Sequence, residues 1–475
     1  MAEKKSNEQT DTIGKQVAPV LNPPELDGMK RCIDDVVRAA SKWDSPGPAE
    51  PSNYQALMAR LAKVETKLPP LYREDMLKPL VAHLTGLGAQ GFAQVLADDP
   101  KRESGARLLM DTAQAVLQQG EGYENVATDA FQEVVSDLYD GFLSAEDRRG
   151  VNPPDRGTTA PMVKWGNGFG PYTWPISATA DLQAKAGVVS LPRVHARQCL
   201  VAWSALGHET GGHDILGADT GLLGQLQDAV WKKLRGLDEY VADYWQERID
   251  ETASDILGIL NMGPAAAIGL VVFFRGLNLA FSGEPKLSCE GADDDVHPAD
   301  ILRGYLAAEV VAQLRFTDRK AWAKLVAAET DKDAGEIVLA GRAVPKALAR
   351  KSAAQVASVL VWQEMPALES HALGDIQNWR DHDERIVAKL RAALREDTEP
   401  SSLLGAGTYA AHVVAAAVLD ALAKPVALGE AFKRMLGVLH AMHHGNPSWG
   451  PSYLRHPGDI ARRLMYPRAR RAARD

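Results

Sequence analysis

Apolar side chains recur every three or four positions along most of the chain, which is the spacing of one face of a helix. The segments YQALMARLAKVETKL, at 54–68, and MLKPLVAHLTGLGAQGFAQVLA, at 76–97, show this period clearly. The Pro-rich stretches SPGPAEPSN and LPPLYRED interrupt it. A further helix is expected over 128–143. The pattern therefore predicts a helical N-terminal region.

The pattern changes between residues 148 and 192, where Gly, Pro, Trp and Thr are frequent. This part holds GNGFGPYTWPISATADL and AGVVSLPRVH, and we expect strands and loops here. Helical spacing returns from His195. It predicts a helix over 199–213 and a longer amphipathic helix over 237–263, which a Gly-Pro pair closes.

Past Ile301 four or five more helical segments are predicted, with turns at GAGT, AKPVALG and HHGNPSWGPS. The longest apolar run is GPAAAIGLVVFF at 263–274. A membrane-spanning helix needs roughly 20 apolar residues, so this run is too short to span a bilayer. We interpret it as a buried core helix and expect no membrane span.

These patterns predict a mainly α-helical fold with a small β element just before the helix at 199–213. Four parts are expected along the chain. They are a disordered N-terminal tail at 1–23, a helical N-terminal domain at 24–125, a central core at 126–280 and a helical C-terminal domain at 281–475.

The segment SALGHETGGHDIL, at 204–216, places two histidines five positions apart around a glutamate and two glycines. In the zinc-protease helix H-E-x-x-H the histidines are four apart, and their side chains lie about 40° from each other around the axis. A spacing of five turns His213 roughly 140° away from His208 in a regular helix, too far for one ion to bind both rings. A π-bulge absorbs the extra residue, and Gly211 and Gly212 tolerate that distortion best.

The longer amphipathic helix offers further ligands. In RIDETASDILG, Glu251 and Asp255 are four positions apart and share one helix face. A zinc ion held by two imidazoles usually takes a third protein ligand, which Glu251 can supply, and leaves a fourth position for water. The other ring nitrogen of each histidine is most often held by a carboxylate, which Asp255 and Asp250 offer.

The two motifs together resemble the signature of the gluzincin zinc metallopeptidases. HETGGH followed by DETASDILG is similar to their two-helix pattern, and ETASD resembles the Glu-x-x-Ser-Asp second motif of the thermolysin branch. The five-residue histidine spacing departs from thermolysin and resembles the H-E-x-x-x-H variant of the dipeptidyl peptidase III group. The resemblance covers roughly residues 190–258. It implies a zincin-like catalytic core within 126–280 and a C-terminal domain that closes the cleft.

The resemblance also implies roles for single residues. It makes zinc ligands of His208, His213 and Glu251. It makes Glu209 the general base, Asp255 the residue that orients His208, and Asp250 the support of His213. AGVVSLPRVH would be the edge strand that pairs with a substrate backbone. The chain is thus expected to be a zinc-dependent peptidase that acts on a peptide or protein substrate, with the choice of endopeptidase or exopeptidase, the side-chain preference and the oligomeric state left open.

Such a reaction also needs a donor for the oxyanion of its transition state. No single residue is indicated among the candidates Tyr240, Tyr244, His297, His440, His443, His444, Tyr453 and His456. Three of these histidines, in HAMHHGN, stand at helical spacings. We interpret them first as the end of a helix before Gly445, with a metal-binding face or closure of the active-site cleft as the alternatives.

The motifs allow other interpretations. If no ion binds, the acidic residues form a solvated helix face made of Glu247, Asp250, Glu251 and Asp255. The apolar run TASDILGIL would then bury Asp255 unpaired, at a cost of about several kcal/mol. A di-iron bundle needs Glu-x-x-His on two helices, whereas Glu209 and His213 are four apart. The alternative function is a non-catalytic, metal-stabilised interaction or toxin-like module.

Composition and charge narrow the function classes. The chain has 475 residues, of which 45% are hydrophobic and 24% charged, as in ordinary soluble proteins of two or three domains. A net charge of −9 argues against a nucleic-acid partner, and only the tail from Arg462 is basic. Three widely spaced cysteines argue against disulfides and thiolate metal clusters. The polar N-terminus has no signal-peptide run, so we expect a cytoplasmic location, with non-classical export left open.

Overall fold

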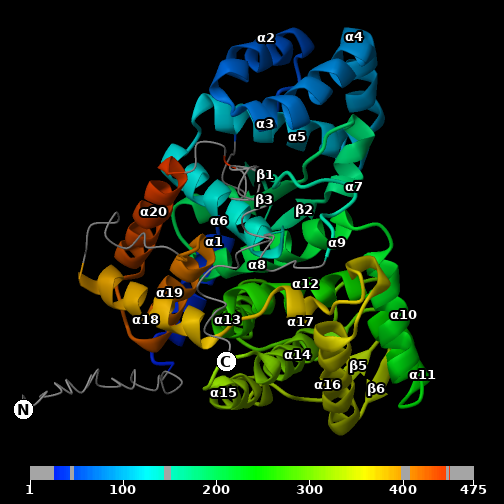
Figure 1. The fold of residues 1–475 in the computed structure, drawn as a ribbon, viewed down its shortest axis with the longest axis vertical. Coiled ribbons are helices and arrows are strands. Elements are labelled where there is room, and N and C mark those ends of the chain that lie inside the picture. The colour runs from blue at the N-terminus through cyan, green and yellow to red at the C-terminus, as the bar shows by residue number, and fades with distance from the viewer. Residues whose placement is uncertain are drawn as a thin grey trace, which may run out of the picture.

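The computed structural model describes residues 26–42, 48–143, 151–168, 170–396, 407–445 and 449. These residues form mainly helices, with two small three-stranded sheets (Figure 1). The expected coarse class, mainly α with a small β element, is therefore confirmed. The tail predicted at 1–23 lies outside the described residues.

The N-terminal helices share a hydrophobic core of their own. It contains Leu57, Leu80 and Leu109, and it extends to Met162 and Val188 of the first sheet. The elements around it are α2 (Tyr54–Val64), η1 (Glu65–Lys67), α3 (Pro70–Tyr72), η2 (Arg73–Leu77), α4 (Lys78–Asp98) and α5 (Gly105–Glu121). The helices expected over 54–68 and 76–97 are thus present, with their ends shifted by a few residues.

The main core is one continuous cluster of buried residues. It runs from Cys32 in α1 (Met29–Ala40) through Phe131 in α6 (Asn125–Leu143) to Leu439 in α20 (Leu428–His444). Helix α1 packs against α13 (Pro264–Ser282), so it belongs to the main core although it precedes the N-terminal helices in the sequence. The predicted domain boundaries stay predictions.

The first sheet lies where strands were expected. Its order is β1 (Met162–Gly166), β3 (Val188–Pro192) and β2 (Tyr172–Trp174), with β3 parallel to β1 and antiparallel to β2. The expectation that AGVVSLPRVH forms an edge strand is wrong, because β3 takes the centre of this sheet. The five residues of β3 are all buried, as suits a strand that is paired on both sides.

The segment that carries the HETGGH motif, residues 200–218, is called the motif segment and is irregular. It begins with the 3₁₀ helix η5 (Leu200–Ala205) instead of the expected α-helix and continues through α8 (Leu206–His208). The π-helix η6 (Glu209–Asp214) and α9 (Ile215–Ala218) follow. The predicted widening of the helix between the two histidines is therefore confirmed.

The amphipathic helix expected over 237–263 is two helices. These are α11 (Glu239–Glu247) and α12 (Ile249–Met262), which follow α10 (Leu222–Leu234). They meet at Arg248, whose φ of −111° and ψ of 22° interrupt the helix. The buried Arg248 guanidinium donates hydrogen bonds to the carbonyl groups of Tyr244, Ala292 and Asp293. These hydrogen bonds connect the helix break at Arg248 to the loop that contains Ala292 and Asp293.

Helix α13 continues the apolar run past Arg275 and has 19 residues. It is long and apolar enough to cross a membrane by length and composition, which corrects the expectation that the run is too short. In this structure 56% of the most apolar 18-residue stretch of this helix is buried. Most residues from Pro264 to Gly276 are enclosed by other helices, as the core-helix interpretation expected.

The C-terminal half holds more helices than the four or five expected. They are α14 (Asp300–Gln313), α15 (Arg319–Asp331), α16 (Lys346–Trp362), α17 (Leu373–Ile376), α18 (Asp381–Glu396), α19 (Ala410–Ala423) and α20. A second small sheet, which sequence analysis missed, has the order β4 (Glu290–Gly291), β5 (Ile337–Leu339), β6 (Arg342–Val344). Its strands are two or three residues long, too short for a visible alternating pattern.

The motif segment and α12 approach each other at glycines. A Cβ atom on Gly212 would lie 2.3 Å from the Cβ atom of Ser254, and one on Gly207 would lie 3.0 Å from the Cα atom of Gly258. Gly211 and Gly212 do not have positive φ. Glycine is therefore required here because the two helices touch, which is a different reason from the backbone freedom expected from the sequence.

Replacing Gly212 with Ala should push α12 away from the π-helix. Overpacking of this kind costs about 1–3 kcal/mol, so we expect the free energy of unfolding to fall by that amount in urea denaturation. Gly224→Ala in α10 is the control, because a Cβ atom there meets nothing within 4 Å. Wild-type stability of Gly212→Ala would show that the contact is not tight.

Candidate metal centre

Three side chains from two helices converge on one point. The Nε2 atoms of His208 and His213 lie 3.1 Å apart. Glu251 Oε2 lies 3.2 Å from His208 Nε2, and Glu251 Oε1 lies 3.4 Å from His213 Nε2. The π-helix thus turns both rings toward α12, although their spacing in the sequence is five.

These separations fit a single metal ion. A tetrahedral ion with bonds of about 2.0–2.1 Å holds its ligand atoms roughly 3.3 Å apart. Glu251 Oε2 is buried and, within the part of the chain that the structure describes, has no hydrogen-bond partner of good geometry. Its neighbours are His208 Nε2 at 3.2 Å and His297 Nε2 at 3.4 Å. Because a poorly satisfied buried carboxylate is costly, a cation between the three ligand side chains would satisfy this oxygen better than these contacts do.

Carboxylates hold the outer nitrogens of both histidines. Asp255 Oδ1 lies 2.8 Å from His208 Nδ1, and Asp250 Oδ1 lies 3.1 Å from His213 Nδ1. An ionised carboxylate only accepts hydrogen bonds, so Nδ1 carries the proton in each ring. In a neutral imidazole this leaves the lone pair on Nε2, the atom that faces the other ligands.

Arg303 of α14 completes the site and was missed in the sequence analysis. Its Nε and one terminal nitrogen donate to Asp255 Oδ2 and Oδ1, both at 2.7 Å. The side chains of both partners are almost completely buried, with 6% and 1% exposed. The signal was a single arginine in the apolar run of α14, which indicates a buried counter-charge but not which one.

The charges around the histidines favour a cation. Burial lowers the pKa of His208, but the carboxylates of Asp255 and Glu251 outweigh it and raise that pKa to about 10. Burial raises the pKa of Glu251, yet His208 and His213 hold it well below its usual range. Burial likewise opposes ionisation of Asp255, but Arg303 and His208 lower its pKa. The site therefore attracts positive charge.

Glu209 is held by the first sheet. The Thr173 hydroxyl donates to Glu209 Oε2 at 2.7 Å and to the Glu209 carbonyl oxygen at 3.1 Å. Thr173 belongs to β2, an edge strand of the first sheet. The strand nearest the glutamate is thus β2, and not the β3 segment that was expected to pair with a substrate.

A cavity of about 570 Å³ borders the site. His208, Glu209 and Arg303 form part of its wall, with Gly170 and Pro171 beside β2. The wall along α13 is mostly apolar, with one polar residue, Asn278, beside Ala266, Leu270, Phe273, Phe274, Leu277 and Phe281. The histidine and the glutamate therefore face a space large enough for a small ligand or part of a chain.

Of the oxyanion candidates, the structure brings His297 to the site. Its Nε2 lies 3.4 Å from Glu251 Oε2, its Nδ1 lies 2.8 Å from Asp295 Oδ1, and it lines the cavity. The hydroxyl group of Tyr240 donates to the carbonyl groups of Leu339 and Ala340, in the turn between β5 and β6. The Tyr244 hydroxyl accepts a hydrogen bond from the Ala299 N–H.

The C-terminal histidines lie elsewhere. His440 Nδ1 is 3.1 Å from Asp129 Oδ2 of α6, and neither His440, His443 nor His444 is among the described residues that line the cavity. Helix α20 ends at His444 with Gly445 as its cap, as the helix-end interpretation expected. Burial lowers the pKa of His443 to about 4. Tyr453 and His456 lie outside the described residues.

The interpretation as a solvated acidic face is wrong for two of its four residues, Glu251 and Asp255. The side chains of Glu247 and Asp250 are 66% and 51% exposed. Those of Glu251 and Asp255 are 11% and 1% exposed and lie against the histidines. The buried pair therefore belongs to the site.

Replacing Asp255 with Ala should leave the Arg303 guanidinium buried without its carboxylate. We expect the free energy of unfolding of metal-free protein to fall by about 3–5 kcal/mol, measured in urea. The half-exposed Asp250→Ala is the control and should change it by about 0.5 kcal/mol or less. The double variant Asp255→Ala/Arg303→Met should recover much of the lost stability. If Asp255→Ala and the double variant lose equal stability, the broken ion pair is not the cause of the loss.

Comparison with known proteins adds no family to this geometry: no family model matches the chain, and searches of curated proteins and of solved structures find no match.

Proposed function

We propose that the protein is a zinc-dependent peptidase that uses Glu209 as general base. The observation that carries the proposal is the convergence of two imidazoles and one buried carboxylate beside a cavity that Glu209 also lines. The resemblance to the gluzincin signature supports the same assignment. The ligands are His208, His213 and Glu251.

Zinc fits this donor set best. Two imidazole nitrogens and one carboxylate oxygen are the ligands of many catalytic zinc sites, which keep a further position open. The hydrogen bonds of Asp255 and Asp250 to the outer ring nitrogens fix the ring orientation that such an ion needs. A bound zinc ion would polarise a carbonyl group and make a water molecule more acidic.

Glu209 then moves the proton. Its carboxylate takes a proton from water as the water oxygen forms a bond to the carbonyl carbon of the substrate. The C–N bond breaks, and Glu209 passes that proton to the departing amine nitrogen. The hydrogen bond from Thr173 to Oε2 holds the carboxylate at the cavity during both steps.

The strand β2 supports a peptide as the substrate. It pairs with β3 on one side and is an edge strand of its sheet, and Gly170 and Pro171 just before it line the cavity. An extended peptide can add to such an edge through backbone hydrogen bonds. The scissile bond would then lie near Glu209, because Thr173 of the same strand contacts that glutamate.

Glu209→Gln is the variant that tests this proposal. It keeps the shape of the side chain but cannot take a proton, so we expect hydrolysis to fall roughly 10²–10⁴-fold while the zinc content stays that of the wild type. The readout is cleavage of a diverse peptide mixture, followed by mass spectrometry, together with elemental analysis.

Glu239→Gln, an exposed glutamate of α11, is the matched control and should cleave as the wild type does. The alternative function, a non-catalytic module stabilised by its metal, predicts no cleavage by any variant. Zinc-loaded wild type that leaves the whole mixture intact, or a fully active Glu209→Gln, would overturn the peptidase proposal.

A further inference from the structure

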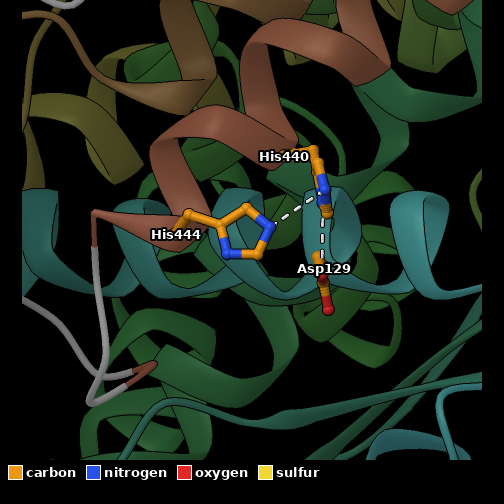
Figure 2. A group of neighbouring side chains, drawn as sticks. All are labelled: Asp129, His440 and His444. Carbon is orange, nitrogen blue, oxygen red and sulfur yellow. Dashed lines mark hydrogen bonds and ion pairs between the residues drawn. The ribbon is translucent and has the colours of Figure 1, made fainter.

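A second histidine pair lies at the contact between α6 and α20. His440 and His444 are four positions apart, on one face of α20, and their Nε2 atoms are 3.0 Å apart. Asp129 of α6 places Oδ2 3.1 Å from His440 Nδ1 (Figure 2). One ligand atom from each of the three residues lies within 4.8 Å of those of the other two.

The pair repeats the geometry of the first site. There, two Nε2 atoms are 3.1 Å apart and a carboxylate lies 2.8 Å from the Nδ1 atom of one ring. At the first site the carboxylate accepts a hydrogen bond from Nδ1. At the second site the Asp129 carboxylate lies at ion-pair distance from His440 Nδ1 and favours a proton on that nitrogen, which leaves the lone pair on Nε2, facing the second ring. The arrangement presents two nitrogen donors at the separation that one ion requires.

The surroundings suit an ion that enters from solvent. His444 is exposed, and the side chains of His440 and Asp129 are 25% and 21% exposed. The buried side of the cluster adds negative charge and a third imidazole, since His443 Nε2 lies 3.7 Å from Asp129 Oδ1 and His443 Nδ1 lies 3.5 Å from Glu133 Oε2. The carboxylates of Asp129 and Glu133 make this contact between α6 and α20 favourable for a cation.

We propose that His440 Nε2 and His444 Nε2 bind a divalent transition-metal ion, with Asp129 holding His440 in the tautomer that binds. Imidazole nitrogen selects zinc, nickel or copper(II) over magnesium or calcium, which prefer oxygen ligands. Water completes the coordination. The site is independent of the proposed peptidase function.

An ion bound at this second site would stabilise the fold. Both ligands are on α20, and the Asp129 carboxylate beside His440 is on α6. A bound ion makes the His440 ring more positive, so it strengthens the contact of that ring with Asp129 between the two helices. An ion that binds only the folded chain raises the free energy of unfolding, and the increase grows with the logarithm of the free ion concentration above Kd. A metal ion at this site would therefore stabilise the packing of the end of α20 against α6.

The test counts zinc ions per chain by equilibrium dialysis and elemental analysis. The full chain should bind about two, because three-ligand and two-ligand sites are both present. His444→Ala should bind one, as should His208→Ala/His213→Ala, and the triple variant should bind none. His444 is exposed, so its replacement does not disturb the core. His83→Ala in α4 is the control and should bind as the wild type does.

Two further measurements distinguish an ion that stabilises the fold from an ion that binds the histidines without stabilising it. In the His208→Ala/His213→Ala background, Asp129→Asn should weaken the remaining zinc site roughly 10–100-fold. Zinc should also raise the thermal unfolding temperature in that background and lose this effect when His444 is replaced. If His444→Ala binds as much zinc as the wild type, the second site does not exist. If His208→Ala/His213→Ala does so instead, the first site is the one that fails.

Discussion

The motif segment crosses α12 in direct contact, and the whole candidate site depends on that crossing. Gly212 faces Ser254 and Gly207 faces Gly258, with no room for a Cβ atom at Gly212. Two of the proposed ligands come from one side of the crossing and the third from the other. An increase of even an ångström in the separation would open the distances of 3.1–3.4 Å on which a shared ion depends.

Charge pairing extends from this crossing into the rest of the core. Arg303 neutralises Asp255, Asp255 holds His208, and His208 contacts Glu251. Each link places a charge that would be unfavourable alone in a buried position, so the series is stable only as a unit. On the other side, Thr173 holds Glu209 at the cavity. The fold thereby separates the residues that can bind a metal from the one that can move a proton.

The parts of the site that depend on local spacing could be predicted from the sequence. The five-residue histidine spacing predicted the π-helix, and the four-residue spacing of Glu251 and Asp255 predicted a shared helix face. Arg303 and Thr173 could not be predicted, because their contacts with Asp255 and Glu209 cross 48 and 36 residues of chain and leave no periodic signal. The prediction that β3 is an edge strand was wrong, since strand order is set by pairing between segments and not by the pattern within one.

The central claim is that one metal ion joins the motif segment to α12. The most direct measurement is an anomalous difference map, recorded at the zinc absorption edge, from crystals of the full chain grown with zinc. We expect a peak about 2.0–2.2 Å from Nε2 of His208, Nε2 of His213 and a carboxylate oxygen of Glu251. Density that shows these three side chains hydrogen-bonded directly to one another, with no peak between them, would contradict a shared metal ion.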